Sequence, residues 1–427
     1  MKIKTVISCS VAACIALLAF AAPAKAEVKV LQYNADGTIK GISSSKKNKS
    51  KKNAGSASGS AQSKSKGNTP ADRYVEGELL VVNPSRHFEV NVKPLGFSVV
   101  AKKKYSSLKL SVLRLRTPAK YSVSEAKAYL SSKFPRLNVD ANHTYDITGT
   151  ALDTPDEFIQ MAALKSSPAS CGRGVRIGMI DGGINLKHPT LAGQKIKYRR
   201  FSAKGTKPGP SAHGTAIAGM FVGKMAKQGL GGYLPAAEVR AASVQEVGPS
   251  RRIIAKASSI LDAIDWLATE KVHVINFNIA GADNKALRTA VERANSKCLI
   301  MVAAVGNWKS TKIPAFPAAY ASVIGVTSVD KKKKIYSRAN RGQYVDFAAK
   351  GVRIWAAGTA KGGQFMSGTS YATPVISSLI AQKNAQGKKS SPEAIRKYLK
   401  GFATDIGSSG KDTTYGWGMI DRASLCK

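Results

Sequence analysis

Acidic residues are scarce in this chain of 427 residues, which has 26 Asp and Glu against 66 Lys and Arg. A formal net charge of +40 would ordinarily favour nucleic acid as a partner. However, no motif that binds nucleic acid is visible, and an N-terminal leader directs the chain away from cytoplasmic nucleic acid. We therefore expect no nucleic-acid partner. The positive charge predicts attraction to anionic envelope surfaces or to acidic proteins. The alternative interpretation is that the charge only keeps the protein soluble.

Cysteine is also rare, with five in the chain, of which Cys9 and Cys14 lie in the leader. The remaining Cys171, Cys298 and Cys426 allow at most one internal disulfide in an oxidising compartment, and the sequence leaves its pairing open. There is no C-x-x-C pair and no Cys/His cluster with metal spacing, which argues against a structural zinc site.

Long apolar runs are absent beyond the N-terminus, so no later segment is expected to span a bilayer. The run Val6–Ala22 follows two lysines and precedes Ala24-Lys25-Ala26. This order is typical of a secretory signal peptide cleaved after Ala26, and the run is short for the alternative, a membrane anchor. The sequence therefore predicts an exported protein, periplasmic or extracellular, from which residues 1–26 are removed.

Side chains to bury are almost missing from Ile42–Asp72, which is built mainly from Ser, Lys, Gly and Asn and includes seven lysines. This composition predicts disorder over residues 42–72, within a basic low-complexity linker that spans residues 27–72. The lysines could tether the protein to an anionic envelope surface, or they could simply keep the linker solvated.

Residues 73–148 have the pattern of a small α+β domain, followed by a polar linker over 149–170. Apolar residues at helical spacing predict a helix over Ser122–Phe134, where Ser122 and Glu125 form a capping box. The predicted strands are 73–82, 109–118 and 137–147.

From residue 171 onward, apolar runs alternate with helical patterns. Strands that are apolar on both faces and alternate with helices are typical of an α/β fold with a parallel sheet covered on both sides. The runs are 175–181, 237–244, 272–280, 298–307 and 321–330, and the helical patterns include 216–226 and 253–270.

Polar side chains follow several of these runs. In parallel sheets, functional residues collect at the carboxyl ends of strands. Asp181 ends the first run, while Asn278 and Asn307 lie near the ends of two others. His213 and Ser370 open helices rich in small residues, so a nucleophile, a base and an orienting carboxylate are available for acyl transfer.

No histidine follows Ser370. This absence excludes the Ser, Asp/Glu, His order of α/β-hydrolases, although GTSYA is close to their nucleophile elbow. The chymotrypsin order requires His before Asp and a chain of β-barrels, which this pattern does not predict. The order Asp181, His213, Ser370 remains.

Several motifs in this order resemble the subtilisin-like serine peptidases, from about Cys171 to the last residue. The motifs are RIGMIDGGINLKHP, HGTAIAG, VAAVGN, PAFPAAYASVIGVTSVD, SGTSYATP and YGWGMID. The resemblance implies an endopeptidase that cuts through an acyl-enzyme. It assigns nucleophilic attack to Ser370, proton transfer to His213, imidazole orientation to Asp181, and the oxyanion hole to Asn307 with the Ser370 N–H. Substrate would add as a strand along the pocket wall. That wall is Asn278, Ile279, Ala280 and Gly281.

Four positions depart from the family pattern, and none removes a catalytic atom. They are Gly182, Ala216, Asn278 and Tyr371. Taken singly, Asp181 could be a turn cap, His213 a core histidine and Asn307 a left-handed turn residue. The loop after His213 lacks a calcium ligand set, so no cofactor and no metal is expected, and calcium dependence is in doubt.

By position and pattern, residues 73–148 resemble the inhibitory propeptide of these peptidases. The resemblance implies a zymogen that cuts itself between Thr148 and Ser170, with its own propeptide and protein or peptide substrates as partners. The alternatives are a permanent N-terminal domain, and a catalytically silent peptide- or envelope-binding protein of the same fold.

Overall fold

The computed structural model describes residues 30–33, 39–43, 73–148, 150–151, 167–248, 250–358, 361–387, 390–421 and 426. Its contacts divide the chain into two compact units, residues 1–66 and 67–427. The predicted signal peptide lies outside the described residues, as do 44–72 and 152–166 of the two predicted linkers.

Two short strands are described in the first unit. They are β1 (Val30–Tyr33) and β2 (Ile39–Ser43), which pair antiparallel. Both lie inside the predicted linker 27–72, and only the last two residues of β2 fall within 42–72, where the composition predicted disorder.

The core of the second unit is a seven-stranded sheet, ordered β19-β18-β17-β15-β8-β12-β9, in which every pair is parallel. The predicted parallel sheet is therefore confirmed. Its strands are β8 (Arg176–Asp181), β9 (Ile196–Arg200), β12 (Glu238–Ser243), β15 (Val274–Phe277), β17 (Ile300–Ala304), β18 (Val323–Val329) and β19 (Phe347–Lys350).

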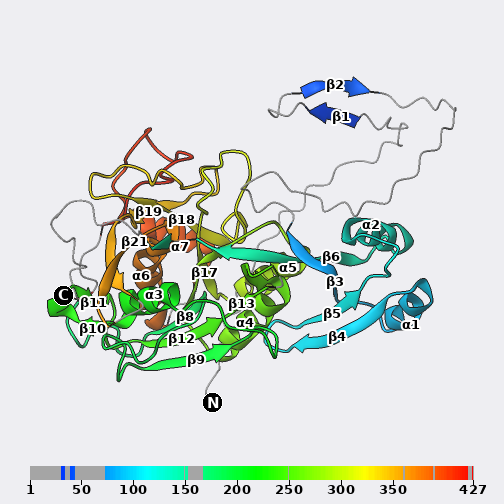
Figure 1. The fold of residues 1–427 in the computed structure, drawn as a ribbon. Coiled ribbons are helices and arrows are strands. Elements are labelled where there is room, and N and C mark those ends of the chain that lie inside the picture. The colour runs from blue at the N-terminus through cyan, green and yellow to red at the C-terminus, as the bar shows by residue number, and fades with distance from the viewer. Residues whose placement is uncertain are drawn as a thin grey trace, which may run out of the picture. The chain divides into compact units, whose positions relative to one another are not determined.

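Helices cover both faces of this sheet (Figure 1). Because successive side chains of a strand point to opposite faces, β8 packs with both layers. Ile177 and Met179 join the core with α3, α6 and α7, while Ile180 joins the core with α4 and α5. The helices are α3 (Ala212–Val222), α4 (Ala257–Thr269), α5 (Lys285–Asn295), α6 (Thr373–Ala385) and α7 (Pro392–Lys400).

A second sheet, ordered β13-β14-β6-β3-β5-β4, joins the N-terminal module (residues 73–148) to the C-terminal part (residues 167–427). The helix predicted over 122–134 is α2, and its capping box between Ser122 and Glu125 is present. The module contributes β3 (Tyr74–Val82), α1 (Phe88–Val92), β4 (Ser98–Tyr105), β5 (Leu110–Arg116), α2 (Val123–Lys133) and β6 (Asn138–Ile147), with a 3-10 turn at Lys93–Leu95. The C-terminal part contributes β13 (Gln245–Val247) and β14 (Ile253–Lys256).

Strand β3 shows how the module packs. Leu79 and Val81 form a core with α1 and α2 on one face of the sheet. Leu80 and Val82 point the other way and share the core of α4 and α5. The module is therefore fixed to the C-terminal part by buried apolar side chains as well as by strand pairing.

Two predicted helices have different bounds in the structure. The pattern over 216–226 is α3 at Ala212–Val222, and β10 (Lys224–Met225) follows, paired with β11 (Leu230–Gly231). The pattern over 253–270 begins as β14, and α4 starts only at Ala257. The remaining short elements are β7 (Thr150–Ala151), β16 (Ile279–Ala280), β20 (Ile354–Ala357), β21 (Gly363–Ser367) and the 3-10 turns Ala226–Gln228 and Thr369–Tyr371.

One disulfide joins Cys171 to Cys426, at a Cα–Cα distance of 5.6 Å across 255 positions of sequence. Cys298 is the cysteine left outside the disulfide among the described residues. Across the same residues, no helix combines the length and the apolar character needed to cross a membrane.

Candidate active site

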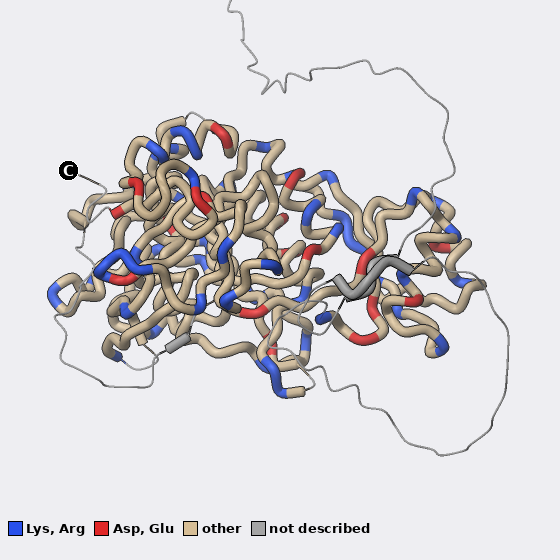
Figure 2. The backbone as a smooth tube through the Cα atoms, turned by 90° about the horizontal axis from the view of Figure 1, so that it is seen from above, with Lys and Arg blue, Asp and Glu red and all other residues tan. Residues whose placement is uncertain are grey.

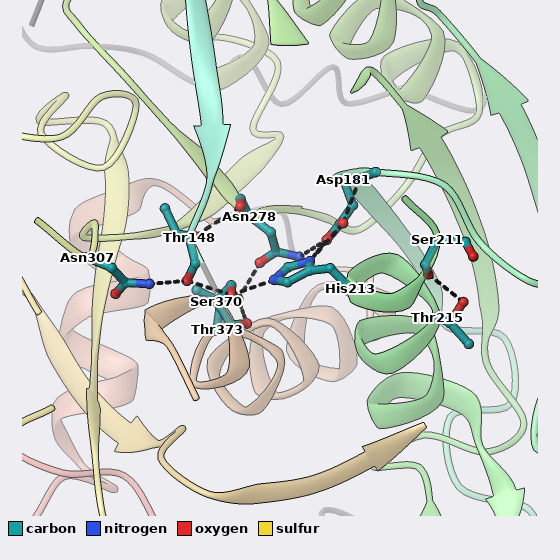
Figure 3. Close-up of polar contacts among 10 residues, drawn as sticks. Thr148, Asp181, Ser211, His213, Thr215, Asn278, Asn307, Ser370 and Thr373 are labelled. Atoms are coloured by element: carbon teal, nitrogen blue, oxygen red, sulfur yellow. Dashed lines mark hydrogen bonds and ion pairs between the residues drawn. The ribbon is translucent and has the colours of Figure 1, made fainter. Parts of the chain in front are cut away.

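Asp181 and His213 meet at the carboxyl edge of the central sheet (Figure 3). Asp181 is the last residue of β8, and His213 is the second residue of α3. The imidazole Nδ1 lies 2.9 Å and 3.0 Å from the two carboxylate oxygens. Both side chains are buried, so the carboxylate fixes the ring with little competition from water.

Ser370 is the third residue of a hydrogen-bonded row formed by Asp181, His213 and Ser370. It lies in the 3-10 turn before α6, and its Oγ is 2.7 Å from His213 Nε2. Gly368, two residues earlier, has φ +155°, a conformation that L side chains rarely adopt, which explains the glycine of SGTS. With Nδ1–H donated to Asp181, Nε2 is free to accept the hydroxyl proton of Ser370.

The carbonyl oxygen of Thr148 is in hydrogen-bond contact with the Ser370 hydroxyl. The Thr148 oxygen lies 2.8 Å from Ser370 Oγ. It accepts hydrogen bonds from the Ser370 N–H, at 3.3 Å, and from the side-chain amide of Asn307. Thr148 ends the N-terminal module, so the module delivers its own last peptide carbonyl to the buried serine.

The amide of Asn307 is held in one orientation. Its Oδ1 accepts hydrogen bonds from the Thr369 N–H at 3.2 Å and the Thr369 hydroxyl at 3.0 Å. The NH₂ group is therefore the end that faces Thr148. Asn307 lies just beyond β17 and follows Gly306, whose φ of +95° turns the chain toward the site.

The strand that leads to Thr148 is held on both sides. On one side, β6 pairs antiparallel with β14, and on the other with β16, where Asp146 lies opposite Ala280. The Thr148 N–H donates to the Asn278 carbonyl at 3.1 Å. The residues predicted as a pocket wall, Asn278 to Gly281, thus flank β6 on one side. The strand on the other side, β14, was missed because residues 253–256 were assigned to a helix, although Ile253 and Ile254 are β-branched.

Tyr145, three residues before Thr148, fills a hollow beside Gly281. Its ring is fully buried, and its hydroxyl donates to the Ala282 carbonyl at 3.0 Å. A Cβ atom on Gly281 would lie 2.5 Å from the ring, which is closer than real contacts allow. Ile147 points into a second hollow of about 220 Å³ beside His213 and Tyr371. Burial, reinforced by the nearby Asp181 charge, raises the pKa of the Tyr371 hydroxyl.

Asn278 also contacts the carboxylate. Its Nδ2 donates to Asp181 Oδ2 at 2.8 Å, and its Oδ1 accepts from the Thr373 hydroxyl at 2.8 Å. The Gly182 N–H donates to Asp181 Oδ1 at 2.6 Å. The motif placed Asn278 on the pocket wall alone. This contact and Thr373 were missed because no sequence pattern fixes which way an amide side chain points.

The two other histidines of the C-terminal part lie outside the row. The His188 side chain is buried, and its Nε2 lies 3.0 Å from the Gly362 carbonyl oxygen. His273 is half-buried, and its Nδ1 accepts a hydrogen bond from the Arg176 N–H at 3.1 Å. Among the residues that the structure describes, no group of three or more His, Cys, Asp or Glu could hold a metal ion.

Comparison with known proteins places this site in a family. The family model described as "Peptidase_S8: Subtilase family" matches residues 172–418. Minor extracellular protease Epr of Bacillus subtilis is 28% identical over 58% of this chain and 38% of its own. Halolysin of Haloferax mediterranei is 30% identical over 74% of this chain and 62% of its own, and Subtilisin Savinase of Lederbergia lenta is 30% identical over 58% and 90%.

The crystal structure of fervidolysin from Fervidobacterium pennivorans has the same fold, with a TM-score of 0.65 and 21% identity over 81% of this chain and 60% of that one. The chain thus spans less than two thirds of Epr, halolysin and fervidolysin. The family match covers more than half of the chain, and Asp181, His213 and Ser370 lie inside it. The chain therefore belongs to the subtilase family.

Proposed function

We propose that this protein is a serine endopeptidase, made as a zymogen that cuts its own chain after Thr148. Asp181, His213 and Ser370 would act as its catalytic triad. The observation that carries the proposal is the position of the Thr148 carbonyl, which lies against the Ser370 hydroxyl with two N–H donors on its oxygen.

The chemistry follows from that position. Ser370 Oγ attacks the Thr148 carbonyl carbon as His213 Nε2 takes the hydroxyl proton, and Asp181 stabilises the imidazolium that forms. The negative charge on the Thr148 oxygen is held by the Ser370 N–H and the Asn307 amide. His213 then protonates the amine of residue 149, which leaves as the C–N bond breaks. Water, deprotonated by His213, hydrolyses the ester and leaves a Thr148 carboxylate.

The N-terminal module is then a propeptide that inhibits by occupying the groove. Its strand β6 lies between β14 and β16, where a protein or peptide substrate would add as an extended strand. After the cut, the new carboxylate end still fills the groove until the module departs. Residues Thr150–Ala151 pair with β21, which supports a groove that continues past the cleaved bond.

We further propose that the protein is exported. The sequence of residues 1–26 supports a removable signal peptide, and Epr is named as an extracellular protease. The proposed mechanism uses protein groups and water, so no cofactor enters it. The lysine-rich segment 42–72 is the proposed contact with an anionic envelope surface, and its deletion should abolish surface retention while leaving peptide cleavage intact.

The decisive experiment compares the wild type with Ser370→Ala by intact mass and with a fluorophosphonate probe. We expect the wild type to yield a C-terminal product that begins at Gly149 and is labelled by the probe, while Ser370→Ala stays long and unlabelled. Identical shortening of both chains would assign processing to another protease. A wild type that neither shortens nor is labelled would favour the silent binding protein.

A further inference from the structure

A cavity of about 440 Å³ lies between the N-terminal module and the C-terminal part, away from the Ser370 site. The module lines it with one face of β4 and β5, including Lys103 and Arg114. The C-terminal part lines it with residues 199–204 and with the first turn of α4. This cavity exists only while the module is docked, because each part supplies one wall.

The charge of the lining is almost all of one sign. A single carboxylate, Asp262, is among the lining residues. Six lining residues are basic: Lys103, Arg114, Arg199, Arg200, Lys204 and Lys256. Figure 2 shows the general excess of basic over acidic positions along the described tube, but here the excess is gathered around one hollow.

Three of these cations are compensated. Lys103 pairs with Asp262, Lys256 Nζ lies 2.5 Å from Glu246, and Arg114 Nε lies 3.8 Å from Glu78. Among the described residues, no carboxylate lies within 4.0 Å of the other three, Arg199, Arg200 and Lys204. The C-terminal wall therefore carries three positive charges without an ion pair, and the Glu246 carboxylate, which accepts hydrogen bonds from the Ala203 N–H and the Thr206 hydroxyl, is the acidic group in contact with this loop.

Two of these three side chains, Arg199 and Arg200, are held by contacts with neighbouring residues. The Arg200 guanidinium is fixed by its own loop, through the Ser202 hydroxyl and through Thr206. The Arg199 guanidinium lies 5.0 Å from the Phe201 ring centre. Ser258 and Ser259 at the start of α4 line the same hollow, where the Ser258 hydroxyl and N–H are bonded to the Asn142 side chain. The gathered positive charge is the feature of this hollow that suits an oxyanion.

Docking also brings like charges together. Docking gives Lys103 its partner Asp262, but it also brings the basic face of β4 and β5 to the 199–204 loop, and repulsion between these like charges offsets part of the docking free energy. An anion between the two walls would remove that repulsion and add charge-assisted hydrogen bonds to both parts. A ligand that binds only the docked state stabilises docking by the factor 1 + [L]/Kd.

We propose that a small multivalent oxyanion of the phosphate type binds in this cavity and holds the N-terminal module on the C-terminal part. The inference deepens the proposed function, because it makes release of the inhibitory module depend on the anion. At an anion concentration of about ten times Kd, the cleaved module should dissociate from its complex about tenfold less readily. An activation step would then follow loss of the anion.

The first test measures binding without catalysis. Full-length Ser370→Ala protein is titrated calorimetrically with inorganic tripolyphosphate, with chloride at matched ionic strength as the reference. We expect saturable binding with one anion per chain. Arg200→Gln/Lys204→Gln should weaken it at least tenfold, whereas the control Lys331→Gln/Lys332→Gln removes the same charge from an exposed turn and should not. Thermal unfolding of each variant checks that it folds.

Several outcomes would overturn the site. They are absence of binding, equal binding by the cavity variant and its control, or binding to anionic phospholipid vesicles without binding to tripolyphosphate. The second test adds tripolyphosphate to cleaved wild-type protein and follows release of the module. Slower release than in matched chloride supports the bridging role, and an unchanged rate overturns it. If the wild type never cuts itself, the proposed function fails. The calorimetric titration of the Ser370→Ala protein would still show whether the cavity binds the anion.

Discussion

The Asn278 side chain links Asp181 to the start of α6, the helix that follows Ser370. Its amide nitrogen donates to Asp181 Oδ2, and its amide oxygen accepts the Thr373 hydroxyl, which also donates to the Ser370 carbonyl at 2.9 Å. Its backbone carbonyl holds the Thr148 N–H. One residue therefore contacts the carboxylate, the helix start and the docked chain.

We predict that Asn278→Ala lowers kcat for a short peptide by about tenfold to a hundredfold, because a hydrogen bond to a buried charge is lost. KM should change little, since the backbone contact to substrate remains. Steady-state kinetics across pH 5–9 would test this. If kcat is retained and only the melting temperature falls, Asn278 is a structural residue and does not position Asp181.

The rate of self-cleavage should depend on Gly281, because the buried Tyr145 ring packs directly against this residue. In Gly281→Ala the new methyl group would overlap the buried ring, and overpacking by a methyl group costs about 1–3 kcal/mol. Self-cleavage should slow by roughly fivefold to a hundredfold. The added change Tyr145→Ala should restore part of the rate.

Gly362→Ala is the matched control, since a Cβ there meets nothing within 4 Å. Time courses of precursor loss by intact mass would measure all four proteins. A double variant no faster than Gly281→Ala would show that the clash with Tyr145 is not the cause.

The Asn307 amide is predicted to act in the transition state. Asn307→Ala should lower kcat by about 10²–10³, the loss that follows removal of an oxyanion-hole asparagine in a subtilisin. Substrate binding should be nearly unchanged, because the groove strands are intact. Kinetics on a peptide substrate, after separation of the module, would check this. A rise in KM at constant kcat would instead make Asn307 a binding residue.

His273 is predicted to make folding sensitive to acid. Burial, with help from the Arg176 charge, lowers the pKa of His273 in the folded state. The unfolded chain then binds the proton more readily, so stability falls as pH drops through about 6.5 toward the folded pKa, and the loss levels off below it. Melting temperatures of Ser370→Ala protein between pH 7.5 and 5.5 should fall further than those of the same protein with His273→Gln.

His87→Gln, at an exposed position, is the control for that series. The melting temperature of the His87→Gln variant should fall with decreasing pH as much as that of the parent Ser370→Ala protein. Equal slopes for the parent and the His273 variant would mean that His273 contributes nothing to acid sensitivity.

The sequence located the parts of the site that lie in short motifs. Asp181, His213, Ser370 and Asn307 each sit where a buried strand ends or a helix starts, and local pattern is enough to find such places. Five of the seven strands of the parallel sheet were found for the same reason. The two edge strands of that sheet were missed, because β19 has only four residues and β9 interrupts its apolar residues with lysine and arginine. Strand β4, at the edge of the second sheet, was missed because it contains three consecutive lysines.

Contacts between residues that are far apart in the sequence could not be predicted from local sequence patterns. That the Thr148 carbonyl meets Ser370 depends on how a whole module docks across 222 positions of sequence. The second groove wall at β14 was obscured by the helical pattern that follows it. Three cysteines allowed three pairings, and only the packed chain brings Cys171 to Cys426.

The Cys171–Cys426 disulfide lies wholly on the C-terminal side of Thr148. It therefore does not cross the proposed cleavage site, and a non-reducing denaturing gel should separate the two products of the first cut. Within the C-terminal part the same bond closes almost the entire chain into a loop. A later nick in any exposed segment between the two cysteines would open that loop without freeing a fragment, so autolytic damage should become visible only after reduction.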